Sequence, residues 1–346
     1  MQVLPRVKVG KGAGQPEGTP DEKPAGKLTV VPRPVATTSE GKLADNTFRV
    51  LVYACAVSLL VIVALILFEL VRQSNLSLHK FGLKFFSTST WNPVSGEFGA
   101  LPFIFGTVVS SLLALLMAVP LSLGTALFLT ELCPPWLRRI LSLTVELLAA
   151  IPSVIYGLWG IFVLAPLLRH YVEPWLQSTF GWTGLFEGAP YGIGMLAAGI
   201  ILAIMILPIV CSVTREVILA VPQHQREAVL ALGATKWEML RMGVLRNARA
   251  GILGGVILGL GRALGETMAV TMVIGNRPEI SKSLIAPGYT LASVIANEFS
   301  EAVDNMHLSS LVEIALVLFI LTLVVNALAR LLVWSVTRGA AARTLA

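Results

Sequence analysis

Two charged residues, Arg262 and Glu266, lie four positions apart in an apolar run that extends from Ala250 to Asn276. Residues at this spacing share a helix face and can form an ion pair. At 100° per residue, three glycines fall on the same face: Gly251, Gly255 and Gly259. Repeated G-x-x-x-G spacing allows a second helix to approach closely. We therefore predict that the charged pair lies at a close contact between helices.

Two interpretations of the Arg262 side chain are open. A mid-membrane arginine costs at least about 2.5–3.5 kcal/mol to insert, so it should face protein or water. It could form a structural ion pair with Glu266 that holds helices together. It could instead line a solute path, because guanidinium presents a fork of donors that matches the oxygens of an oxyanion. Arg262 is the only cation within the six apolar runs, which favours the path, with Glu266 holding Arg262 in place.

A polar loop at about residues 216–250 has its own local pattern. Residues 222–232 begin on a proline and predict a short helix, and Gly233 suits the position just after its end. Thr235 and Glu238 form a T-x-x-E capping box that starts a second helix. The loop is therefore predicted to be a helix, a tight corner and another helix.

The first of these short helices carries Glu227 beside the small residue Ala228. A compact helix of this kind could dock in a groove of another protein. An ordinary amphipathic helix at the membrane interface is the alternative, and the spacing alone does not separate the two.

The composition places these segments in a membrane. The chain of 346 residues is 55% hydrophobic and 13% charged, with mean hydropathy +0.78, whereas a soluble domain carries about twice that charged fraction. About 20 apolar residues cross the hydrocarbon core. Six runs are long enough: Val50–Phe68, Phe98–Thr130, Ile140–Leu168, Gly188–Thr214, Ala250–Asn276 and Leu308–Ala329. They are continuous rather than alternating, which predicts an all-α integral membrane protein with six transmembrane helices rather than a barrel.

Charge fixes the expected orientation. Lys and Arg are concentrated in the N-terminal tail, in the loops after the second and fourth runs and at the C-terminal end, so both termini are expected in the cytoplasm. Residues 1–48 are rich in Gly, Pro, Lys and Glu and are expected to form a disordered cytoplasmic tail. Residues 49–346 then form the membrane domain. The net charge of +6 is explained as a topology signal, and no nucleic-acid partner is implied.

Motifs for enzymatic chemistry are absent from the sequence. No segment completes G-x-x-x-x-G-K-[ST], so no P-loop for ATP is expected, and the outer loops are too short for a folded receptor domain. The three cysteines (Cys55, Cys133 and Cys211) show neither metal nor disulfide spacing. No catalytic residue, cofactor or metal site is expected, and active transport would need other chains to hydrolyse nucleotide and capture solute.

Three further residues are candidates for a structural or gating role: Glu146, Pro152 and Glu313. Glu146 lies near the inner end of the third run and could bind the polar loop or a neighbouring helix, and a structural role is favoured. Pro152 is expected to kink its helix. Glu313 lies near the outer end of the sixth run and is expected to reach water.

The sequence Glu227-Ala228-Val229, followed by Gly233, resembles the EAA signature of ABC importer permeases. In that family the signature forms the coupling helix that seats in the ATPase subunit. The resemblance therefore implies that Glu227, Ala228 and Gly233 couple the chain to an ATPase. The family pattern continues with I-x-L-P, whereas this chain has Gly243-Val244-Leu245-Arg246, so that only the leucine matches.

Longer motifs resemble the PstC family of phosphate-specific permease subunits. They are VPLSLG at 119–124, ELLAAIPS at 146–153, GRALGETMAV at 261–270 and APGYTLAS at 286–293. The resemblance implies the type I ABC importer permease fold (MetI-like), a bacterial plasma membrane location and ATP-driven phosphate import. It also implies a PstA-like second permease subunit, two copies of a PstB-like ATPase and an external PstS-like phosphate-binding protein. Arg262 and Glu266 lie in one of the most specific motifs and are the expected pathway residues.

Three other functions are considered. A permease for sulfate or molybdate would use Arg262 equally well, and only the motifs favour phosphate. A secondary transporter or channel would need no coupling helix and would usually show inverted repeats, of which the sequence gives no convincing sign. In a membrane scaffold or sensor, Arg262 and Glu266 would be dispensable for flux.

Overall fold

The computed structural model describes residues 39–341, with side chains for residues 45–335, so most of the predicted tail (1–48) lies outside the described residues. The α-helices are α1 (Ser39–Gln73), α2 (Asn75–Phe81), α3 (Leu101–Leu127), α4 (Pro135–Ala150), α5 (Ser153–Trp159), α6 (Ala165–Leu167), α7 (Glu173–Phe180), α8 (Met195–Leu219), α9 (Gln223–Ala231), α10 (Lys236–Glu238), α11 (Arg246–Gly265), α12 (Met268–Val273), α13 (Leu291–Glu298) and α14 (Asn305–Ala341). Short 3₁₀ turns (η1, Gly82–Phe86; η5, Gly181–Thr183) and π-helical turns (η2, Phe128–Leu132; η3, Gly160–Leu164; η4, Leu168–Val172; η6, Met239–Leu245) link or extend them.

Six helical stretches within residues 39–341 are long and apolar enough to cross a membrane. They are Asp45–Gln73, Leu101–Leu132, Ser153–Thr183, Met195–Leu219, Lys236–Gly265 and Asn305–Ser335. These lengths confirm the prediction of an all-α, multi-pass membrane protein with six transmembrane helices. The first and sixth stretches extend beyond the predicted runs at both ends, and the other four are displaced along the chain relative to them.

Contacts divide the chain into two units, residues 1–60 and 61–346. The described part of the first unit is the beginning of α1. The second unit holds the rest of α1 and the helices from α2 to α14.

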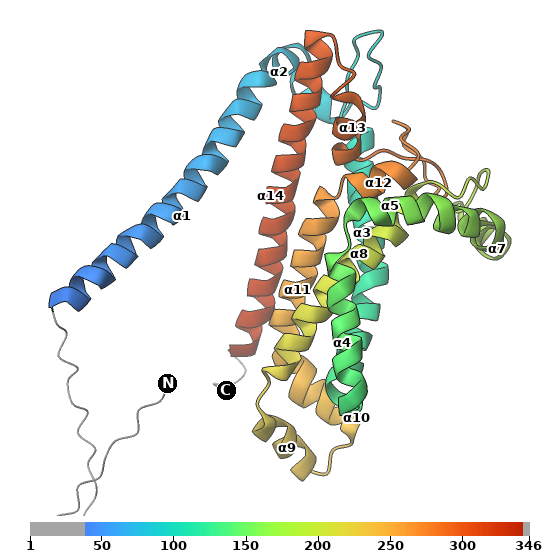
Figure 1. Ribbon diagram of the computed structural model, residues 1–346. Helices are drawn as coiled ribbons and strands as arrows, with labels where there is room; N and C mark the ends of the chain where they lie inside the picture. Colours follow the sequence, from blue (N-terminus) through green and yellow to red (C-terminus); the bar gives the residue numbers. More distant parts are fainter. Residues whose placement is uncertain (1–38, 342–346) are drawn as a thin grey trace, which may run out of the picture. The chain divides into compact units, whose positions relative to one another are not determined.

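Helix α8 is the centre of the second unit. It packs against α3, α4 and α11 (Figure 1), and 67% of its most apolar 18-residue stretch is buried. Three buried hydrophobic clusters follow one another along this bundle. One lies at the end that carries α9, one along the first half of α8, and one at the opposite end near α13. The stacked clusters hold the helices that surround the candidate site.

The third predicted span is interrupted at Pro152. Helix α4 ends at Ala150, Ile151 has an extended ψ of 127°, and α5 begins at Ser153. Proline lacks the N–H that would continue the ladder and disfavours the helical conformation of the residue before it. After this point the chain runs crosswise to α4 through α5 and α7 (Figure 1). The expectation of one kinked helix over residues 140–168 is therefore wrong, because the proline ends the helix.

Pro152 also leaves one carbonyl without its usual donor. In a continuous helix, the carbonyl of Leu148 would accept from the N–H of residue 152, and proline has none. The hydroxyl of Tyr156 donates to this carbonyl instead, at 2.8 Å. A side chain thus replaces the missing backbone hydrogen bond at the turn between α4 and α5.

A polar and aromatic cluster holds the end of the bundle near α13. The Trp91 indole N–H donates to Glu298 at 2.9 Å, and His307 contacts the same carboxylate oxygen at 3.1 Å. Tyr289 is buried beside them, receives a hydrogen bond from Asn297, and donates to Glu298. Burial raises the pKa of Tyr289 to about 12, so its hydroxyl stays neutral at physiological pH.

Candidate transport and coupling sites

The fifth run predicted from the sequence, residues 250–276, is interrupted next to its charged residues. Helix α11 ends at Gly265, Glu266 has an extended ψ of 127°, and α12 begins at Met268. Glu266 and Thr267 therefore lie outside both helices. Within a membrane, non-helical backbone is tolerated only where it is buried in protein or lines a water-filled cavity.

Arg262 and Glu266 do not form the predicted ion pair. Arg262 lies in the last turn of α11 and is exposed, and among the described residues no carboxylate lies within ion-pairing distance of it. Glu266 is 9% exposed, and its Oε1 accepts from the N–H of Ala269 at 3.3 Å. The prediction of pairing along one face is wrong because it assumed a continuous helix, and the helix ends between the two residues.

The break in the fifth run adjoins the turn at Pro152. Helix α12 packs on α5, where a Cβ at Gly157 would collide with the side chain of Met272. Tyr156 of α5 and Ala263, the residue that follows Arg262, belong to the same buried cluster. Two interruptions in neighbouring spans thus meet beside one exposed cation. Sequence reasoning did not bring them together, although Pro152 and Gly265 were visible signals.

The predicted glycine contact is confirmed. The three glycines of α11 face α8, where the Cβ positions of Gly255 and Gly259 would lie 3.1 and 2.8 Å from the side chains of Val213 and Val210. A Cβ at Gly251 would likewise press on Val217. The absence of side chains on this face therefore permits the close approach of α11 to α8.

The polar loop folds as predicted into a helix, a corner and a helix. Helix α9 ends near Gly233, whose φ of +84° favours glycine. The capping box is present: Thr235 Oγ1 accepts from the Glu238 N–H at 3.3 Å, and Glu238 accepts from the Thr235 N–H at 2.8 Å. This element lies at one end of the bundle (Figure 1).

The coupling candidates on this loop are exposed. Glu227, Ala228 and Gly233 all lie on the surface of the described chain. Two large apolar side chains beside them, Leu232 and Trp237, are 87% and 63% exposed. A helix with small and apolar residues open on one side is suited to contact a partner protein.

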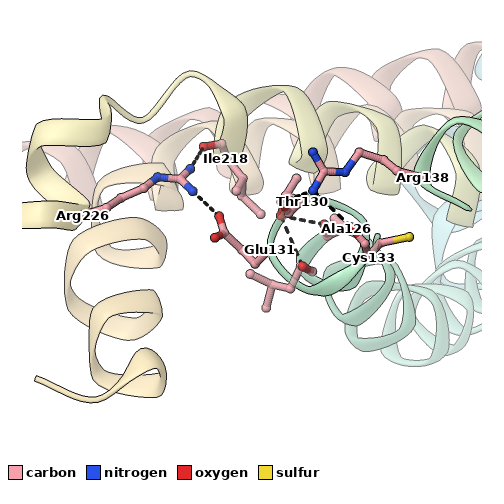
Figure 2. A network of polar contacts seen from close by, with 8 residues as sticks. Ala126, Thr130, Glu131, Cys133, Arg138, Ile218 and Arg226 are labelled. Atoms are coloured by element: carbon pink, nitrogen blue, oxygen red, sulfur yellow. Dashed lines mark hydrogen bonds and ion pairs between the residues drawn. The ribbon is translucent and has the colours of Figure 1, made fainter. Parts of the chain in front are cut away.

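Helix α9 is fixed to the membrane bundle by polar contacts. Arg226 forms an ion pair with Glu131 and donates to the carbonyl of Ile218 at 2.8 Å, as Figure 2 shows. On the other side, Asn247 donates to Gln225 at 2.8 Å. Sequence reasoning missed the Arg226–Glu131 pair, although Glu131 directly follows the uncharged run 98–130 and was therefore a visible signal.

The two remaining charged candidates differ in their environment. Glu146 forms an ion pair with Arg215 of α8 at 3.2 Å, so it contacts a neighbouring helix. Glu313 of α14 is 1% exposed, and neither of its oxygens has a hydrogen bond of good geometry, although Ser77 lies close by. The expectation that Glu313 reaches water is wrong, because α2 folds over this part of α14.

Comparison with known proteins decides the family. A model of the "binding-protein-dependent transport system inner membrane component" family matches residues 118–338. The chain is 50% identical over 299 residues to the phosphate transport system permease protein PstC of Mesorhizobium japonicum, covering 85% of this chain and 91% of the relative. The chain belongs to this family of inner-membrane transport components. Within it, the chain is a PstC-type member and a permease subunit of an ABC importer.

Other family members agree with this assignment. The PstC proteins of Xylella fastidiosa and Pasteurella multocida are 44% and 46% identical, over 90% and 82% of this chain and 98% and 89% of their own. A solved structure of the inward-facing MetNI methionine ABC transporter shares the fold, with TM-score 0.50, 17% identity and coverage of 71% of this chain and 99% of that one. The family is one of transport components that work with other subunits rather than of catalytic chains.

Proposed function

We propose that the chain imports inorganic phosphate as one of two permease subunits, with Arg262 on the translocation path. The second subunit would be PstA-like, two copies of a cytoplasmic PstB-like ATPase would drive transport, and an external PstS-like protein would deliver phosphate. The names of the relatives support phosphate as the substrate.

The observation that carries the path assignment is the environment of Arg262. Its guanidinium is exposed and lies beside two helix interruptions. Among the described residues, no carboxylate forms an ion pair with it. Secondary transporters place such broken helices at their binding sites, and in membrane proteins generally non-helical backbone is tolerated where it lines a water-filled cavity. A phosphate ion offers several acceptor oxygens to the guanidinium fork. Glu266 caps α12 instead of neutralising Arg262, which leaves the positive charge available for an anion.

Helix α9 would be the coupling element. We propose that Glu227 and Ala228 sit in a groove of the ATPase and that Gly233 lets the chain turn back toward the membrane. The exposure of this helix and the positive φ of Gly233 support the assignment. The loop would then lie in the cytoplasm of a bacterial cell, and the alternation of six spans would place both termini on the same side.

A transport assay tests the substrate. The permease would be reconstituted in vesicles with its partner permease, the ATPase and the binding protein. We expect ATP-dependent uptake of radiolabelled phosphate that excess unlabelled phosphate suppresses and excess sulfate or molybdate does not. Suppression by sulfate at equal strength would identify a general oxyanion permease. Uptake without the ATPase would identify a secondary transporter or channel and overturn the proposal.

A further inference from the structure

The end of α3 is held in place where it meets α9. The π-helical turn η2 extends α3, and Arg138 in the first turn of α4 donates to the carbonyl of Thr130 in η2 at 3.0 Å and to that of Cys133, just after η2, at 3.3 Å. These two carbonyls lie on either side of Glu131 in the sequence (Figure 2). The segment that carries Glu131 is therefore anchored to α4 independently of its contact with α9.

Arg226 connects α9 to this anchored segment. One guanidinium nitrogen pairs with Glu131, and another donates to the carbonyl of Ile218 near the end of α8. The side chains of Arg226 and Glu131 are only 19% and 13% exposed, so water screens the pair weakly. Figure 2 shows the Arg226 guanidinium with one dashed line to Glu131 and one to the carbonyl of Ile218. The backbone connects α9 to α8 and α10, whereas the ion pair between Arg226 and Glu131 connects α9 to the end of α3.

We propose that Arg226 is a positioning residue that makes α3 follow the movement of α9. This inference rests on the proposed docking of α9 on an ATPase. A force applied at α9 reaches α8 and α11 along the backbone, and Arg226 passes it to α3 and, through η2 and Arg138, to α4. Because Arg226 directly precedes Glu227, the contact with the partner and the contact with the membrane bundle lie on the same turn of helix.

A distance measurement in the assembled complex tests this link. Spin labels at His224→Cys on α9 and Leu132→Cys on η2 occupy exposed positions, in a chain whose three native cysteines are replaced by alanine. With Arg226 present, we expect one narrow distance distribution that does not change between the nucleotide-free and the ATP-bound complex. In Arg226→Gln with Glu131→Gln, which leaves no unpaired charge, we expect the distribution to broaden or shift when ATP binds.

Transport gives an independent measurement. The double variant should still co-purify with the ATPase, yet phosphate moved per ATP hydrolysed should fall at least about fivefold, the lower end of measured couplings between sites. Arg139→Gln, which removes an exposed cation of α4 with no described contact, is the matched control and should behave as the wild type. If the double variant fails to assemble, Glu131→Gln alone carries the same two expectations.

Two results in the double variant would overturn the link: a distance distribution that stays as narrow and as constant between nucleotide states as in the chain with Arg226, or a wild-type ratio of transport to hydrolysis. The distance experiment needs no phosphate. If the complex moved another solute, the proposed substrate would be wrong. The distance measurement would still show whether Arg226 couples α9 to α3. A wild-type chain that never binds the ATPase would contradict the proposed function itself.

Discussion

A break in the backbone separates Arg262 from Glu266 and gives the two residues different environments. Arg262 ends α11 with its side chain exposed, and Glu266 is buried with its carboxylate on the N–H of Ala269. The roles that follow are also different. Arg262 is available to an anion, and Glu266 stabilises the beginning of α12.

For Arg262, we expect Arg262→Gln to reduce phosphate uptake roughly tenfold to a hundredfold, because a hydrogen bond to a charged group is worth about 1.5–3 kcal/mol. Assembly should be preserved, since among the described residues no carboxylate loses a partner. Uptake in reconstituted vesicles is the measurement. The control is Arg277→Gln, which removes an exposed arginine outside the spans. Uptake near the wild-type rate in Arg262→Gln would exclude this residue from the path.

For Glu266, the two substitutions Gln and Leu should differ. Glu266→Gln keeps a carbonyl oxygen that can accept from Ala269, so stability and uptake should stay close to the wild type. Glu266→Leu removes the acceptor and should cost about 1 kcal/mol, as the loss of a helix cap does. Thermal unfolding of the purified chain in detergent gives the comparison. A large loss of uptake in Glu266→Gln would show that the negative charge itself is needed.

The corner after α9 depends on Gly233. A Cβ there would meet no neighbour, so Gly233→Val adds only backbone strain, of order 1–3 kcal/mol for a forced left-handed residue. We expect the strained corner to weaken the stimulation of ATP hydrolysis by the loaded binding protein. Gly254→Ala is the matched control, because this glycine also has open space around its Cβ position but lies inside α11 with ordinary helical φ. Equal stimulation in both variants would refute the assignment of the corner.

The contact between α8 and α11 should tolerate no added side chain. Gly255→Leu would press on Val213, where even a Cβ lies at 3.1 Å, and overpacking typically costs about 1–3 kcal/mol. We expect a lower unfolding temperature in detergent. The smaller variant Gly255→Ser should lie between Leu and the wild type. If Gly255→Leu were as stable as the wild type, the helices would not be as close as the structure has them.

The buried carboxyl of Glu313 should be replaceable by an amide. A buried polar group without a partner costs about 1–3 kcal/mol, and the charged form costs more. Glu313→Gln removes the charge and retains the shape, so we expect stability equal to or above that of the wild type. Glu313→Lys places a cation in the same buried position and should prevent accumulation of the protein in membranes. A clear loss of stability in Glu313→Gln would indicate that the carboxylate has a partner in the assembled transporter.

The features that the sequence predicted depend on local pattern. The six spans follow from apolar length, and the corner at Gly233 with its capping box follows from residues that are neighbours in the chain. The glycine contact of α11 also follows from spacing, because the helix is continuous from Gly251 to Gly259. Each of these inferences needs only the few residues that form the feature.

The features that it did not predict depend on where helices end and on distant partners. The pairing of Arg262 with Glu266 was inferred from a helical period, which stops at Gly265. Burial of Glu313 is caused by α2, far earlier in the chain. The Arg226–Glu131 pair joins two segments whose closeness follows only from the packing of α3 on α8.

The turn at Pro152 restricts the order in which the chain can change during evolution. Tyr156 supplies the hydrogen bond that Pro152 cannot give to the carbonyl of Leu148. If the proline were lost first, a new N–H at position 152 could take over that carbonyl, and the tyrosine would then be free to vary. If the tyrosine were lost first, only the longer hydrogen bond from the Ile151 N–H, at 3.4 Å, would remain on that carbonyl, at a cost of about 1 kcal/mol. Lineages that have replaced Tyr156 with a residue lacking a donor should therefore already have lost the proline.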